Sequence, residues 1–474
     1  MEHQSFWLFG IFCFFGAKCW CVEDHVVSYT GMMMPFFLLL FLMSAMHCSP
    51  LHLRSQKHFI NYATKMAKLP YTFAVGSDYT SEPSRQAMYR LTSDLAEGLA
   101  ACSCRFQNPM LYGLIGVLNV MLQIRNATVV HEVAGHGVIG SRLNKNAPYY
   151  QWSHNPKAKK RLFWSLLTAP TFKMGAATYQ ELTDEQLRNF QPYRSFLEGR
   201  TSLEGREIFP IEDNQKGRDR LHLIELDARQ SYAGMNAEVE LSRYMSKRVL
   251  QGEVVRSETI FLYLRRLAQS QYSGPDVKQL GNDHTVVDAY YRHLLDSPNA
   301  VRSARNKGYL VTFLSGTFAS YARALFLGDV VKPFWLFDRV LWPDFSIFYT
   351  RKGPSVLIES ALRITDQAYI SFGCEYVFCP GKDYFTKEKL SAQEWRFGFC
   401  ANVSKSLKVA AYSLIQGYGG MVEAVWEKPE KYFGVSIGWG WSSDKTLCGE
   451  RMQERDLPGK EKSHFGYFRY HFIV

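Results

Sequence analysis

In the last third of the chain, apolar residues alternate one by one with polar or small residues. In the segment 395–403, for example, an aromatic or aliphatic side chain stands at every second position. Because successive side chains of a β-strand point to opposite faces, this pattern predicts strands with one apolar face. About eight such segments follow one another in 341–474, and their short Gly- or Pro-containing links predict an antiparallel β-meander, closed as a barrel or stacked as a sandwich. The predicted strands are 345–350, 356–364, 368–378, 395–403, 407–416, 421–427, 433–441 and 468–474.

The part of the chain before this β-domain has a different period. From about residue 85 to residue 340, apolar residues recur every three to four positions, which is typical of amphipathic helices. We therefore expect an α+β protein, with a mainly helical domain at 51–340 followed by an antiparallel β-domain at 341–474. Two apolar runs stand out in the helical part, 110–124 and 309–328. They predict either buried core helices or segments that lie at a membrane.

The polar residues that break the first apolar region have the composition of a metal site. The sequence of 127–137 is ATVVHEVAGHG, in which His131, Glu132 and His136 share an otherwise apolar stretch. Two imidazoles and an adjacent carboxylate are the parts of a helical zinc site. Residues five apart point about 140° apart on a regular α-helix. We therefore expect a one-residue π-bulge, or a helix end near Gly135, to bring both imidazoles to one side.

A zinc site of this kind needs a third ligand, and Glu238 is the predicted one. It lies in the segment 233–240, AGMNAEVE, whose small residues would let a second helix pack tightly on the motif helix. The two motifs resemble the gluzincins, a group of zinc metallopeptidases in the zincin class. The resemblance implies that His131, His136 and Glu238 bind Zn²⁺ and that Glu132 activates a zinc-bound water. It further implies a hydrolase that cleaves peptide bonds.

Other interpretations of these polar residues remain open at this stage. His131, Glu132 and His136 also fit a buried network without metal, because polar groups in an apolar stretch need partners. A second histidine cluster, in 284–293, is better explained as an ordinary amphipathic surface. The rival third ligands and the members of that second cluster are Glu240, His222, Glu225, Asp227, His284, Asp288 and His293.

The spacing of the strands resembles that of outer-membrane β-barrels. The two long polar connections, 379–393 and 443–463, follow the third and seventh predicted strands, so they fall at the same end of the meander. Short turns at one end and long loops at the other are typical of such barrels. A soluble sandwich or barrel packed on the helical part explains the alternation equally well. In both cases Cys379 and Cys448 lie at the same end, where they could pair.

The first 50 residues predict export. The uncharged run 32–45, MMMPFFLLLFLMSA, has the length of a signal-peptide core, and an uncleaved membrane anchor is the alternative for 1–50. Six cysteines follow Cys48, and no CxxC pair among them suggests a zinc ribbon. The expected location is the cell envelope, in the periplasm or outer membrane, or another membrane-associated site.

The net charge of the chain is +11, which suits an anionic membrane surface or nucleic acid. No nucleic-acid-binding signature accompanies it, so the predicted partners are a membrane and a peptide or protein substrate. Two functions follow from the sequence. The first is an exported or membrane-associated zinc metallopeptidase-like hydrolase. The alternative is a structural protein of the cell envelope or outer membrane, in which the histidine motif is a non-catalytic network.

Overall fold

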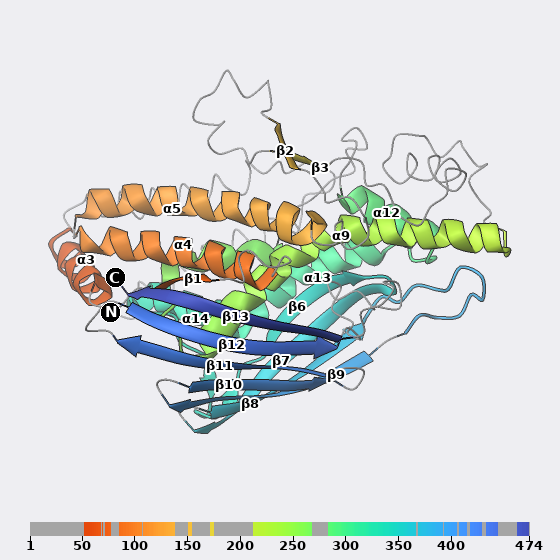
Figure 1. Cartoon of the computed structure of the whole chain (residues 1–474). Coiled ribbons are helices and arrows are strands. Elements are labelled where there is room, and N and C mark those ends of the chain that lie inside the picture. The colour runs from red at the N-terminus through yellow and green to blue at the C-terminus, as the bar shows by residue number, and fades with distance from the viewer. Residues whose placement is uncertain are drawn as a thin grey trace, which may run out of the picture.

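The computed structural model has helices and one large antiparallel sheet, so the predicted α+β class is confirmed (Figure 1). It describes residues 52–67, 69, 72–76, 85–106, 108–137, 150–153, 171–174, 212–267, 283–365, 368–391, 393–404, 407–414, 418–428, 433–443 and 462–473. The expected signal peptide or anchor at 1–50 lies outside these residues.

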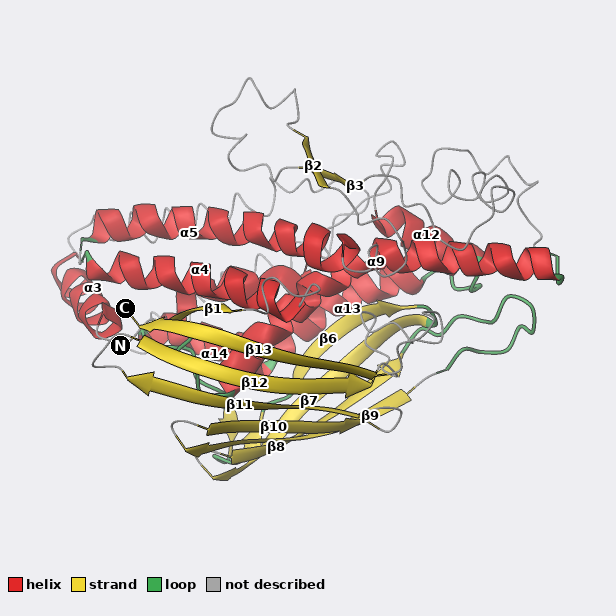
Figure 2. Ribbon diagram, viewed as in Figure 1, coloured by secondary structure: helices red, strands yellow, loops and turns green. Residues whose placement is uncertain are grey.

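The helices lie together over one face of the curved sheet (Figure 2). They are α3 (His52–Ala67), α4 (Arg85–Arg105), α5 (Pro109–Val129), the π-helix η2 (Val130–Gly137), α9 (Gln215–Leu250), η5 (Ser257–Thr259), α10 (Ile260–Tyr263), η6 (Leu264–Leu267), α12 (Asp283–His293), α13 (Ala300–Leu314) and α14 (Gly316–Leu327).

Thirteen strands are described. They are β1 (Thr72–Gly76), β2 (Tyr150–Ser153), β3 (Thr171–Met174), β4 (Trp335–Leu336), β5 (Val340–Leu341), β6 (Asp344–Thr350), β7 (Gly353–Thr365), β8 (Ala368–Val377), β9 (Gln393–Ser404), β10 (Leu407–Leu414), β11 (Tyr418–Lys428), β12 (Phe433–Ser443) and β13 (Lys462–Ile473).

The predicted antiparallel meander is confirmed for β6 to β13, in which each strand pairs with the next along the chain. The whole sheet has the order β1-β13-β12-β11-β10-β9-β8-β7-β5-β4, and β6 also pairs with β7. Among the described strands, the two ends of this order are not paired with each other, so the described sheet is open and not a closed barrel. The edge strand β1 comes from the helical half of the sequence. It is only five residues long, too short to carry a clear alternation.

Helix α9 is the centre of the molecule because it contributes to two hydrophobic cores. One core lies between α9, α12, α13 and the strands β6 and β7, and it includes the buried rings of Tyr291 and Tyr349. The other lies between α4, α5, η2, α9, α10 and α14. Small residues of α9, among them Ala233 and Ala237, are fully buried and let its neighbours approach closely.

The two apolar runs adopt different structures. The run 110–124 lies in α5, which continues into η2; together they form one helix, Pro109–His136, long and apolar enough to cross a membrane, as are many buried core helices. The run 309–328 is not one helix, because α13 and α14 meet at a bend of 50° at Ser315. The Cys379 thiol is free, and Cys448 lies outside the described residues.

Candidate metal centre

The histidine motif forms a π-helix, which is longer than the one-residue π-bulge that was one of the two predicted departures from the α-helix. Helix α5 changes at Val130 into η2, which spans Val130–Gly137. In a π-helix the backbone bonds join residues five apart, so such residues lie on the same side. The rings of His131 and His136 are accordingly close, with centroids 4.8 Å apart, and their Nε2 atoms are 3.1 Å apart.

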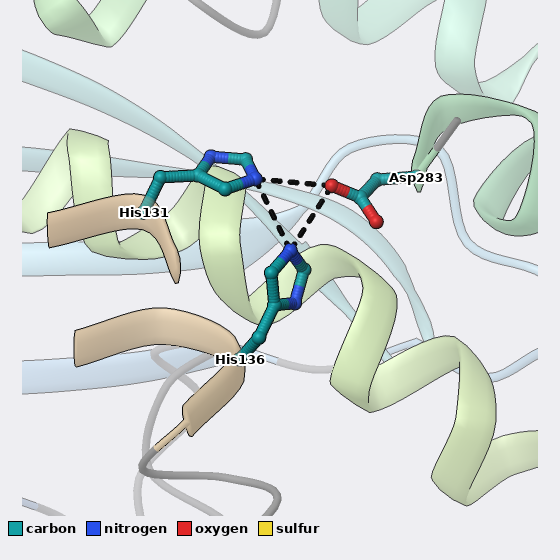
Figure 3. Close-up of side chains that lie close together, drawn as sticks. All are labelled: His131, His136 and Asp283. Carbon is teal, nitrogen blue, oxygen red and sulfur yellow. Dashed lines mark hydrogen bonds and ion pairs between the residues drawn. The ribbon is translucent and has the colours of Figure 1, made fainter. Parts of the chain in front are cut away.

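Asp283, the first residue of α12, completes a group of three. Its Oδ2 atom lies 3.0 Å from Nε2 of His131 and 3.2 Å from Nε2 of His136 (Figure 3). A search of the described residues for three or more histidine, cysteine or acidic side chains close enough to hold a metal ion finds His131, His136 and Asp283. Sequence reasoning missed Asp283. The only signal was its position directly before His284, in the histidine cluster that was interpreted as an amphipathic surface.

Glu238 has a different place from the predicted one. Its Oε1 atom lies 3.0 Å from Nδ1 of His131, on the side of the ring that faces away from Asp283 and His136. The same oxygen accepts a hydrogen bond of 2.7 Å from Nη2 of Arg265. The Glu238 carboxylate is fully buried. The structure therefore puts Asp283 in the third position of the group and Glu238 behind His131, where a carboxylate orients a metal-binding imidazole.

The other acidic and histidine candidates have separate partners or surroundings. Glu240 pairs with Arg243, and Asp288 pairs with Arg292 on the same helix. His284 packs its ring edge-on against Tyr349, with the centroids 5.9 Å apart. The side chains of His222 and Asp227 lie outside the described residues.

His136 has its own orienting group. Its Nδ1 atom lies 2.6 Å from the backbone oxygen of Gln230 in α9. A carbonyl oxygen can only accept, so Nδ1 of His136 must be the donor. Both imidazoles of the group therefore have an acceptor on Nδ1, which leaves both Nε2 atoms facing the shared point with Asp283.

Two glycines let η2 approach α9 closely enough for these contacts. A Cβ atom on Gly135 would clash with the backbone of Gly234, so the two helices touch at these residues. A Cβ atom on Gly234 would lie 2.5 Å from Nε2 of His131 and 2.7 Å from Nε2 of His136. The two imidazoles thus rest directly on the backbone of α9. This confirms the predicted close packing of the small-residue segment 233–240 on the motif helix.

Burial and charge act in opposite directions on the pKa values of the site. Burial lowers the pKa of His131, but hydrogen bonds to Asp283 and Glu238 outweigh it and raise that pKa to about 10. Burial would raise the pKa of Asp283, but the two imidazoles hold it well below its usual range. The pKa of Glu132 is raised, mainly by burial and against the attraction of both imidazoles. The group therefore stabilises positive charge between its ring nitrogens and carboxylates.

No family model matches the chain, and no similar protein was found among curated sequences or solved structures. The chemical argument for the site consequently depends on its own residues. The resemblances to gluzincins and to outer-membrane barrels stay predictions from the sequence.

Proposed function

We propose that the protein is a zinc-dependent hydrolase of the metallopeptidase kind, with His131, His136 and Asp283 as its metal ligands. One observation carries this proposal: three electron-pair donors face one point in the interior. Since Nδ1 of His136 donates to a backbone carbonyl, the neutral ring has its lone pair on Nε2. The Glu238 carboxylate favours the same tautomer of His131. Two ring lone pairs and a carboxylate oxygen would repel one another unless a metal ion or a proton on an Nε2 atom lay between them, and zinc would replace that proton.

The distances between the donor atoms support zinc. Bonds of about 2.0–2.1 Å at tetrahedral angles put neighbouring ligand atoms about 3.3 Å apart. The three separations in the site are 3.0, 3.1 and 3.2 Å. Three protein ligands leave the fourth tetrahedral position open, as in catalytic zinc sites. Structural zinc sites, by contrast, have four protein ligands.

Glu132 is the proposed general base. It follows His131 directly in η2, is only partly buried, and has a raised pKa, which brings a carboxylate closer to the proton affinity that general-base catalysis requires. Bound zinc would supply an activated water and polarise the carbonyl of the substrate. Glu132 would accept the proton of the attacking water and return it to the leaving amine. Arg265 and Glu238 would hold the His131 ring in position throughout.

The substrate and location follow the sequence predictions and remain proposals. A peptide or protein is the proposed substrate, because the His-Glu motif resembles that of peptidases. Export to the cell envelope, or association with a membrane, is proposed from the apolar run 32–45 and the +11 charge.

Zinc stoichiometry of matched variants tests the metal site. We expect about one zinc per full-length chain, lost in His131→Ala and in Asp283→Asn. Asp288→Asn is the control, because Asp288 lies on the same helix α12 but pairs with Arg292 on its surface. Glu132→Gln should keep zinc and lose hydrolysis of a denatured protein substrate. A folded parent that binds no zinc when zinc is supplied would overturn the proposal.

The same experiment would then favour the alternative function. Without metal, a protonated His131 can donate to both Glu238 and Asp283, in agreement with its raised pKa. The three residues would form a buried polar network in a structural protein of the cell envelope. In that case Asp283→Asn would lower stability in the presence and absence of zinc alike.

A further inference from the structure

Away from the metal centre, the helices at one end of the molecule expose large apolar side chains. Helix α3 crosses this end next to the start of α5 (Figure 1). Tyr62 of α3 packs edge-on against Tyr112 of α5, with the ring centroids 6.4 Å apart. The Tyr62 ring also lies 3.3 Å from the position of a Cβ atom on Gly328, the C-cap of α14. Tyr62 of α3 therefore contacts the start of α5 and the end of α14.

The exposed apolar residues lie within about one turn of these contacts. Met110 is 85% exposed, Leu327 is 65% exposed, and Leu114 and Phe326 are more than half exposed. We call this surface the helical end; its apolar members are Ile60, Met110, Leu114, Leu325, Phe326 and Leu327. Large apolar side chains exposed this close to one contact between three helices are typical of an interaction site in a folded protein.

The sequence of α3 is basic. Helix α3 contains Arg54, Lys57 and Lys65 and no acidic residue. Asp329, which follows the end of α14, is already paired with Lys65 at 2.9 Å and with Lys332 at 3.0 Å. Glu258 accepts hydrogen bonds from Tyr62 and Tyr112. Asp329 and Glu258, the carboxylates seen to contact α3 among the described residues, are therefore neutralised or engaged within the protein.

The position of the N-terminal apolar run indicates the partner. Six residues, 46–51, separate the run 32–45 from the start of α3 at His52, and a link of that length spans at most about 25 Å when extended. We propose that the helical end docks on the surface of an anionic lipid bilayer. Its apolar side chains would enter the acyl region, and lipid phosphates would attract the basic helix α3. This inference is independent of the proposed hydrolase activity.

Binding of the full-length chain to vesicles tests the proposal. The probes are vesicles of phosphatidylcholine alone and of phosphatidylcholine with an equal amount of phosphatidylglycerol. We expect tighter binding to the anionic vesicles, weakened by salt. Leu114→Glu and Phe326→Glu should each lower the partition coefficient at least tenfold, because a charge replaces an inserted apolar side chain. Phe372→Glu is the control; it changes an exposed aromatic residue on β8, in the sheet.

Three outcomes would overturn the proposal. The first is unchanged vesicle binding in Leu114→Glu and Phe326→Glu. The second is equal binding to charged and uncharged vesicles. The third is a stable dimer in the absence of lipid that these two variants dissociate, because a second copy would then cover the surface. An unchanged melting temperature in each variant establishes that the fold is intact. A change in vesicle binding then reports on the helical end itself.

Discussion

Replacing Gly234 with alanine should weaken metal binding at least a hundredfold while keeping the protein folded. The new Cβ atom would lie 2.5 Å from Nε2 of His131, 2.6 Å from Cδ2 of the same ring and 2.7 Å from Nε2 of His136. Ordinary contact begins at 3.4 Å, so the His131 ring must move by about 3.4 − 2.5 = 0.9 Å. Metal sites tolerate deviations of about 0.2 Å in ligand distance. The required movement is several times larger.

The expected effect on stability is much smaller. Alanine favours a helix over glycine by about 1 kcal/mol. Overpacking costs about 1–3 kcal/mol. The free energy of unfolding of metal-free Gly234→Ala should therefore lie within about 2 kcal/mol of the parent value. Zinc affinity should fall at least a hundredfold, or about 2.7 kcal/mol.

Thermal melts with zinc and with chelator measure both the stability of the metal-free protein and the stabilisation that zinc adds. At a zinc concentration of about 100 times Kd, the parent gains about 2.7 kcal/mol from the metal. Gly234→Ala, with at least hundredfold weaker binding, should keep at most about 0.4 kcal/mol of that gain. Gly116→Ala on α5 is the matched control, since a Cβ atom there meets nothing within 4 Å. It should stabilise the chain slightly and keep the zinc effect. A Gly234→Ala protein with parental zinc affinity would refute the proposed position of the metal.

Three further results are expected. Glu238→Gln should weaken zinc binding about 10–100-fold in a competition titration, because the proposed role of Glu238 is to orient His131 and not to bind the metal. Complete loss of zinc from this variant would indicate instead that Glu238 is a ligand. Folding raises the pKa of His131 from about 6.5 to about 10, so its contribution to stability should be intact below about pH 6.5 and lost as the pH rises through about 10. Urea unfolding in the presence of chelator measures this dependence. Constant stability over this pH range would contradict the hydrogen bonds of His131 to Asp283 and Glu238. Zinc affinity should instead rise with pH, because the metal displaces a proton from His131. A calorimetric titration that shows no proton release on zinc binding would contradict this displacement.

The local part of the site could be predicted from the sequence, and the distant part could not. The five-residue spacing of His131 and His136 demands a departure from the α-helix, which is why the π-helix was foreseeable. Asp283 lies 152 residues from His131, and no local pattern links the two. Glu238 was expected in the site and does contact His131, but at Nδ1, and spacing alone does not distinguish the two nitrogens of an imidazole.

In the fold, too, local features could be predicted from the sequence and distant contacts could not. Alternation predicted the meander from β6 to β13, because a strand with one buried face has a period of two. The pairing of β1 with β13 joins residues about 400 apart in sequence and has no signature in either strand. Whether a meander closes depends on the twist and tilt of its strands, which side-chain periodicity does not encode.

Two neighbouring arginines in η6 have a consequence for how the protein unfolds. Arg265 donates to Glu238 behind the histidines, and Arg266 binds both oxygens of Asp344, the first residue of β6, at 3.2 Å. Arg266 also donates to the backbone oxygen of Phe345 at 2.6 Å. The predicted boundary at residue 340 therefore falls across a buried ionic junction. The two halves should melt as one cooperative unit, and neither should be exchangeable as an independent module.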